Sequence, residues 1–147
     1  MNNQYNPQKH VKWDCTYHVV ITPKYRKKVL YDKKKQRIGE IIRELSKQRE
    51  VEIVAGNARP DHIHMIMRIP PKHSVAFAMG FLKGKSAIKM HQEFCKIKRA
   101  LGQKSFWSRG YFVSTVGINR AAVEKYVKEQ RKRDKYIDGD QLDLNWD

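Results

Sequence analysis

The chain has 147 residues, enough for one domain with a modest core, and no apolar run approaches the ~20 residues of a membrane span. Lys and Arg number 31 against 15 Asp and Glu, and the formal net charge of +16 favours a polyanionic partner. The basic segments lack a wide apolar face, which argues against a membrane-surface role. The N-terminus lacks a signal-peptide pattern and Cys15 and Cys95 lie far apart, so we expect a reduced, cytoplasmic protein.

The sequence contains no repeat, low-complexity tract or linker, so we predict a single domain over residues 1–147. Alternating apolar residues predict a strand over 11–21, and apolar residues at helical spacing predict a helix from Asp32 to about Gln48. The further predicted elements are strands over 51–55 and 62–69, a helix from Ser74 through Leu82 that Gly84 interrupts, a basic helix over 85–99, a strand over 112–116 and a final helix over 119–133. The order β-α-β-β-α-α-β-α predicts an α+β fold with helices packed on an antiparallel sheet.

A pair of histidines lies in the strand that is predicted after Pro60-Asp61. Side chains alternate across a strand, so His62 and His64 face one side, and Ile63 and the methionines that follow face the other. Two neutral imidazoles at this spacing can converge on one cation. An isolated His-x-His pair is more often a pair of polar surface residues, but here the opposite face is apolar and the strand is expected to be central.

The last predicted helix carries Tyr126 and Gln130, which lie four residues apart and therefore share one helical face. Taken alone, this helix favours an ordinary reading, in which Tyr126 is a core aromatic and Gln130 a polar residue. The helix and the histidine pair together suggest a catalytic metal site. Two imidazoles and one amide oxygen leave open positions on a divalent ion, which could polarise a phosphodiester for attack by Tyr126.

These residues resemble the single-tyrosine HUH transposases of the smallest bacterial and archaeal insertion sequences, the IS200-like family. The resemblance rests on the His-hydrophobic-His motif followed by a helical Tyr-x-x-x-Gln. It extends over nearly the whole chain through the segments Pro60–His64, Phe81–Ser86 and Phe106–Gly117. The acidic stretch over 138–147 lies outside the matched motifs, and we assign it no role.

The resemblance implies that His62, His64 and Gln130 bind Mg²⁺ or Mn²⁺ and that Tyr126 is the nucleophile. It implies cleavage and rejoining of single-stranded DNA at insertion-sequence ends that carry subterminal hairpins, through a 5′-phosphotyrosine intermediate with a free 3′-OH. It also implies an RRM/ferredoxin-like sheet, a tyrosine-bearing C-terminal helix, and a homodimer whose active sites are completed in trans. The location would be the bacterial or archaeal cytoplasm.

Basic clusters supply candidate DNA-binding residues. Eight of the fourteen residues over 24–37 are Lys or Arg, and a second cluster covers 125–135. A helix break at Gly84 would expose backbone N–H groups and two ammonium ions to a phosphate, although a simple kink on a solvated helix explains the pattern equally well. The predicted contacts are Lys24, Arg26, Lys27, Lys83, Lys85, Ser86, Arg109 and Lys125. Phe106 and Trp107 could stack on an unpaired base or fill the core, and we favour the core.

Three alternatives compete with the transposase. A non-enzymatic RRM-like nucleic-acid-binding domain would explain the charge and element order, but such modules place stacking aromatics, not histidines, on the sheet. A metal-dependent hydrolase of small phosphate esters is a second alternative. Two observations count against it: the sequence lacks carboxylates near the histidine pair, and so large a positive charge is unnecessary for a small substrate. A domesticated relative that acts on repeated chromosomal palindromes would carry the same motifs.

Overall fold

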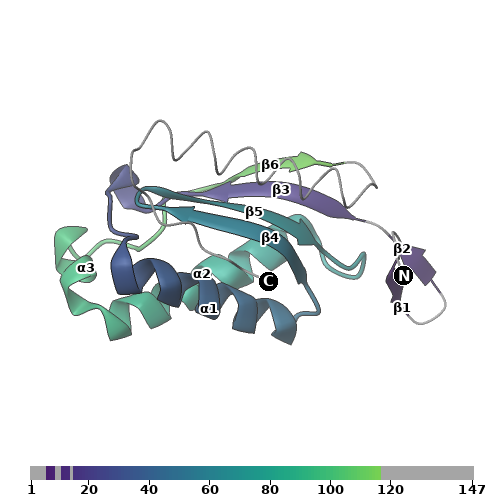
Figure 1. Ribbon diagram of the computed structural model, residues 1–147, viewed down its shortest axis with the longest axis horizontal. Coiled ribbons are helices and arrows are strands. Elements are labelled where there is room, and N and C mark those ends of the chain that lie inside the picture. Colours follow the sequence, from purple (N-terminus) through teal and green to yellow (C-terminus); the bar gives the residue numbers. More distant parts are fainter. Residues whose placement is uncertain (1–5, 9–10, 14, 117–147) are drawn as a thin grey trace.

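The computed structural model describes residues 6–8, 11–13 and 15–116, and in these ranges it has one main sheet and three α-helices. The main sheet has four strands in the order β4-β5-β3-β6, with every neighbouring pair antiparallel. Helices α1 and α2 cover one face of it (Figure 1). The bounds are β3 (Thr16–Ile21), α1 (Asp32–Gln48), β4 (Glu52–Arg59), β5 (His62–Arg68), α2 (Val75–Glu93), α3 (Cys95–Ala100) and β6 (Phe112–Thr115). The predicted α+β sandwich is confirmed; its last helix lies outside the described residues.

The main core lies between the sheet and the two long helices. Strand β5 is central, and its alternate residues Ile63, Met65 and Met67 are fully buried in this core. On the helix side, α1 buries Ile38, Ile41, Ile42 and Leu45, the apolar positions whose spacing predicted this helix. Burying one such side chain is worth roughly 1.5–3 kcal/mol, so this face of the sheet holds the fold together.

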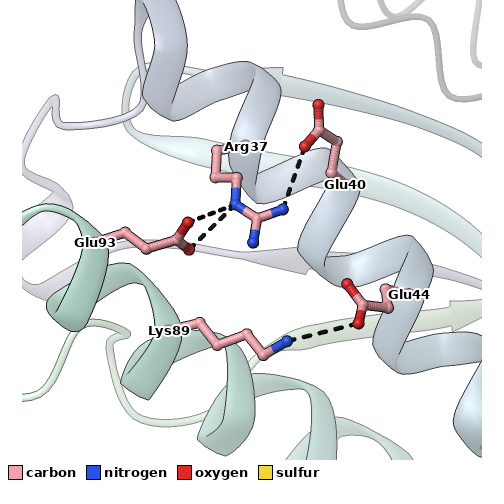
Figure 2. A network of polar contacts seen from close by, with 5 residues as sticks. All are labelled: Arg37, Glu40, Glu44, Lys89 and Glu93. Atoms are coloured by element: carbon pink, nitrogen blue, oxygen red, sulfur yellow. Dashed lines mark hydrogen bonds and ion pairs between the residues drawn. The ribbon is translucent and has the colours of Figure 1, made fainter.

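Ion pairs join α1 to α2 at the solvent edge of their contact (Figure 2). Arg37 Nε lies 2.8 Å from a carboxylate oxygen of Glu93, and Arg37 also pairs with Glu40 within its own helix at 3.2 Å. Lys89 Nζ lies 3.8 Å from Glu44. Because exposed pairs of this kind contribute at most about 1 kcal/mol each, they align two helices that apolar burial already holds together.

Several predicted boundaries differ from the structure. The strand predicted over 11–21 is divided into β2 (Val11–Trp13), which pairs with β1 (Asn6–Gln8), and β3 in the main sheet. Strand β4 continues past Gly56 to Arg59, because every residue over 55–59 pairs with β5. In β4 a register irregularity between Ile53 and Ala55 marks a bulge.

The predicted helix break at Gly84 is wrong. Helix α2 runs without interruption from Val75 to Glu93, and the chain turns instead at Phe94, before α3. One glycine inside a helix costs about 1 kcal/mol. The buried side chains of Met79, Leu82 and Met90 on either side of Gly84 outweigh that cost. The start of the helix is as predicted, since the Ser74 hydroxyl accepts a hydrogen bond from the Phe77 backbone N–H.

The segment between α3 and β6 packs into the core through two aromatic rings. Phe106 is fully buried and Trp107 nearly so, and their ring centroids lie 4.6 Å apart at a steep angle. The Trp107 Nε1–H donates a 2.9 Å hydrogen bond to the hydroxyl of Ser86 on α2. The expectation that these aromatics fill the core is confirmed. Within the described part of the chain, no helix is both long and apolar enough to cross a membrane.

We predict that Ser86→Ala lowers the free energy of unfolding by about 1–3 kcal/mol, because it leaves the buried Trp107 N–H without its acceptor. Urea unfolding measures this loss. Lys104→Ala, at an exposed residue of the segment that carries Trp107, is the control and should change stability by less than about 0.5 kcal/mol. In a double-mutant cycle with Trp107→Phe, the two losses should not add; full additivity would show that the hydrogen bond contributes nothing.

Candidate functional site

The second face of the sheet, opposite the main core, carries a group of mostly polar side chains that we call the histidine face. Residues paired across antiparallel strands point to the same side. His64 of β5 is paired with Val20 of β3 and Asn57 of β4, and His62 is paired with Arg59. The histidine face, at the end of the sheet near the β4–β5 turn, therefore includes His62, His64, His18, Val20, Asn57, Arg59, Phe112 and Ser114. The prediction that both histidines share one face of a central strand is confirmed.

His62 and His64 lie against each other at the start of β5. Their ring centroids are 4.6 Å apart and their planes are nearly perpendicular. Nδ1 of His62 lies 2.7 Å from Oδ1 of Asp61, in the turn that joins β4 to β5. Oδ2 of Asp61 accepts a 3.2 Å hydrogen bond from Arg26. Because an ionised carboxylate can only accept hydrogen bonds, Nδ1 of His62 carries the proton.

The Asp61 carboxylate is held in its ionised form. Burial acts to raise its pKa, but the hydrogen bond and charge of His62, together with the charge of Arg26, outweigh this effect and lower the pKa below its ordinary value. A carboxylate on the outer nitrogen of a histidine fixes the orientation of the ring and makes the other nitrogen a better ligand. The Asp61–His62 pair has this arrangement.

His64 is engaged on its other side by His18. Nε2 of His18 lies 3.3 Å from Nδ1 of His64, and the two rings are stacked with centroids 5.5 Å apart. Burial lowers the pKa of His64 to about 3, helped by the nearby charges of His62, His18 and Arg59. Burial also lowers the pKa of His18. His64 is therefore neutral at pH 7, the protonation state that a metal ligand requires.

These contacts fit a metal ligand pair as far as the described residues extend. The Nδ1 atoms of His62 and His64 are engaged by Asp61 and His18, so Nε2 is the nitrogen through which each ring would bind an ion. In the described ranges, however, no three His, Cys, Asp or Glu side chains are grouped so as to hold a metal. A complete site thus needs further ligands, and Gln130, the predicted one, lies outside the described residues, as do Tyr126 and Lys125.

From the sequence, His18 lies opposite the apolar face of its strand and could approach the histidine pair, but a surface position is favoured; the structure instead places it against His64. It belongs to β3, lies 46 residues from His64 in sequence, and has only 8% of its surface exposed. Its alternation with Tyr17 and Val19 assigns it to the polar face of its strand. The pairing of β3 with β5 places it beside His64, and local sequence spacing does not carry this information.

The predicted DNA contacts differ in their surroundings. Arg26, Lys27, Lys85 and Arg109 are exposed and Lys24 is partly exposed, so all five are accessible to a ligand. Lys83 instead donates hydrogen bonds to the backbone carbonyls of Ser108 and Gly110 at 2.9 and 2.6 Å, and burial lowers its pKa.

The prediction that Ser86 contacts DNA does not fit the structure. It is fully buried, and its hydroxyl accepts from Trp107 and donates to the Lys83 carbonyl. Because α2 is continuous at Gly84, the backbone amides that the predicted break would have exposed stay within the helix. The Lys83–Ser86 segment therefore serves packing in the described structure, and only the exposed Lys85 remains available to a phosphate.

The low pKa of His64 predicts a stability that depends on pH in the metal-free protein. Between its ordinary pKa of 6.5 and about 3, the unfolded chain binds a proton at His64 and the folded chain does not, so stability falls as the pH falls. From pH 7 to pH 5 the contribution of His64 is a loss of about 2 kcal/mol. Urea unfolding with a chelator present should show this loss in wild type and a smaller one in His64→Gln. His73→Gln, outside the cluster, should behave as wild type; equal pH dependence in all three would contradict the prediction.

Comparison with known proteins shows which family the chain belongs to. The family model described as "Transposase IS200 like" matches residues 11–130. The chain is 42% identical over 135 residues to the transposase for insertion sequence element IS200 of Salmonella typhimurium, covering 92% of this chain and 88% of that protein. It is 29% identical over 123 residues to the ISDra2 transposase TnpA of Deinococcus radiodurans, covering 83% of this chain and 88% of that one.

Solved structures agree on the fold. A crystal structure of a candidate transposase from Deinococcus radiodurans superposes with a TM-score of 0.69 at 29% identity, over 85% of this chain and 96% of that one. A REP-associated tyrosine transposase bound to a REP hairpin gives a TM-score of 0.55 at 15% identity, over 86% of this chain and 74% of that one, and supports the fold alone. The family match extends from the start of β2 to beyond the histidine pair, and the chain belongs to the IS200-like transposase family.

Proposed function

We propose that this transposase cleaves and rejoins single-stranded DNA at insertion-sequence ends, with Tyr126 as the nucleophile. The observation that carries the proposal is the pair of adjacent imidazoles on the central strand, one oriented by Asp61 and the other by His18. A partly buried pair held in this way is typical of metal ligands with ordered outer partners. His62, His64 and Gln130 would hold Mg²⁺ or Mn²⁺, and the bound ion would offset the negative charge of the phosphodiester.

In the proposed reaction the Tyr126 phenol loses its proton and its oxygen attacks phosphorus. One O–P bond forms to Tyr126 and the bond from phosphorus to the 3′ oxygen breaks. The phenol proton passes to solvent and the leaving 3′ oxygen takes one up, which leaves a 5′-phosphotyrosine ester and a free 3′-OH. The ester stores the energy of the broken bond, so a 3′-OH of another strand can reverse the step without ATP. His62 and His64 would hold the ion, His64 as a neutral imidazole, and Asp61 keeps the proton on Nδ1 of His62.

Under this proposal, the contacts among the histidines fix which ring nitrogen of each carries its proton. If His64 binds through Nε2, its single proton lies on Nδ1 and is donated to Nε2 of His18. His18 then carries its own proton on Nδ1. Its role is to position the ring of His64, as Asp61 positions that of His62, and both partners come from outside the His-x-His motif.

The partners follow from the net charge and from the relatives. The formal net charge of +16 favours capture of a polyanion, and a relative of the same fold is bound to a REP hairpin. We propose single-stranded DNA with subterminal hairpins as the substrate, and a homodimer in which the helix bearing Tyr126 completes the partner's site. The proposed location is the bacterial or archaeal cytoplasm.

We expect a covalent protein–DNA adduct that requires both a divalent ion and Tyr126. Purified protein is mixed with labelled single-stranded DNA from the ends of its own element, with Mg²⁺ or Mn²⁺, and resolved on a denaturing gel. Wild type should form the adduct, and Tyr126→Phe should form none because it lacks the attacking oxygen. Tyr31→Phe, at an exposed tyrosine, is the control and should react as wild type. An adduct with Tyr126→Phe would refute the assignment of the nucleophile.

We expect Asp61→Asn to weaken Mn²⁺ binding by about 10- to 100-fold, because the amide orients and polarises His62 less strongly than the carboxylate does. Titration calorimetry of the unreacted protein measures the affinity directly. Arg26→Gln is the matched control, since it removes the other partner of the same carboxylate and leaves the contact with His62 in place. Equal losses in the two variants would assign the effect to the turn as a whole, and no loss in Asp61→Asn would contradict the role of Asp61.

A further inference from the structure

The connection between β3 and α1 presents an aromatic ring to solvent in an unusual backbone conformation. Tyr25 is 64% exposed, the most exposed of the large hydrophobic side chains in the described ranges. It has a φ of +61° and the next residue, Arg26, has a φ of +50°. Two consecutive non-glycine residues in the left-handed region cost of order 1 kcal/mol or more each, and such conformations persist only where the surroundings fix them.

Two separate anchors fix this connection. On one side, the Lys24 backbone N–H donates to the Phe106 carbonyl at 2.8 Å, and the Ser108 hydroxyl donates to the Pro23 carbonyl at 2.9 Å. Phe106 is itself fully buried, so this anchor is part of the core.

On the other side, the backbone N–H groups of Val29 and Leu30 both donate at 3.0 Å to the carbonyl of Pro60, in the β4–β5 turn. Between the anchors, the Arg26 side chain pairs with Asp61. The segment is thus held rigidly at both ends, although its central side chains are exposed.

Basic residues adjoin Tyr25 along the chain. Lys24, Arg26, Lys27 and Lys28 fall within five residues, and Arg26 is 65% exposed at its side chain even while paired with Asp61. Nζ of Lys24 lies 5.8 Å from the centroid of the Tyr25 ring. An aromatic platform among closely spaced cations matches single-stranded nucleic acid, whose unpaired bases stack while the flanking phosphates pair with ammonium and guanidinium groups.

We propose that residues 24–28 form a single-strand clamp, in which Tyr25 stacks on an unpaired base and the surrounding Lys and Arg side chains hold the adjacent phosphates. The clamp rests on the proposed function, because it takes the same DNA. Asp61 bonds both to Arg26 of the clamp and to His62, so the clamp is fixed directly beside the proposed metal site. Its role is to position an unpaired nucleotide next to the phosphodiester that is cut.

The test uses a short thymidine oligonucleotide with one central 2-aminopurine, whose fluorescence falls when its base stacks. We expect the full-length protein to bind it and quench it. Tyr25→Ala should bind about 5- to 100-fold more weakly and lose the quenching, whereas Tyr25→Phe should retain both, because the ring and not the hydroxyl does the stacking. Phe77→Ala, at an exposed ring on α2, is the matched control and should behave as wild type.

Salt dependence separates stacking from charge. Tyr25→Ala removes no charge, so the log–log slope of affinity against salt should equal that of wild type, while Lys27→Gln should reduce its magnitude by about 0.7. Unchanged affinity and quenching in Tyr25→Ala would overturn the clamp, as would equal losses in Tyr25→Phe or Phe77→Ala, or no binding by wild type.

The covalent adduct assay, run on the same samples, keeps this inference distinct from the proposed function. Quenching that depends on Tyr25 in a protein that forms no adduct with DNA would refute the proposed chemistry and leave the clamp standing. An adduct that forms with no dependence of binding or quenching on Tyr25 would refute the clamp and leave the chemistry standing.

Discussion

The two-residue alternation of the central strand β5 is the constraint on which the rest of the structure depends. Ile63, Met65 and Met67 are buried against the helices, and this burial fixes the register of the strand, because a shift by one residue would turn the apolar side chains out of the core. The same register places His62 and His64 together on the opposite face. The geometry of the candidate site is therefore stabilised by side chains on the other side of the sheet.

Electrostatics on the histidine face follows from the same burial. His64 loses water because β5 is central, and the nearby His62, His18 and Arg59 further disfavour a proton on it. A chain with so large an excess of basic residues attracts phosphates and at the same time disfavours a cationic imidazole at its centre. Among the residues that the structure describes, Asp61 contacts His62 through its carboxylate. Asp61 lies in the β4–β5 turn, where it interacts with both Arg26 and His62.

Local patterns in the sequence predicted those features that depend on local spacing. Helix α1 was predicted from Asp32 to Gln48 because its apolar residues recur at helical spacing, and the face shared by His62 and His64 follows from strand alternation. Features that depend on tertiary contacts were not accessible. Gly84 predicts a helix break from the sequence alone, but the buried side chains of α2 outweigh the cost of this glycine and keep the helix continuous. His18 reads as a surface residue until β3 pairs with β5.

The turn at Pro60 and Asp61 connects the two parts of the molecule that the proposals concern. The Pro60 carbonyl accepts the backbone N–H groups of Val29 and Leu30, and the Asp61 carboxylate contacts both Arg26 and His62. The loop that follows β3 and the imidazole on β5 thus share one rigid support, although they lie far apart in sequence. Displacing the exposed loop would require breaking backbone hydrogen bonds at the same turn that orients His62. A strand held by this loop is therefore held in a fixed position relative to the histidine pair, and this fixed position is what cutting at one phosphodiester requires.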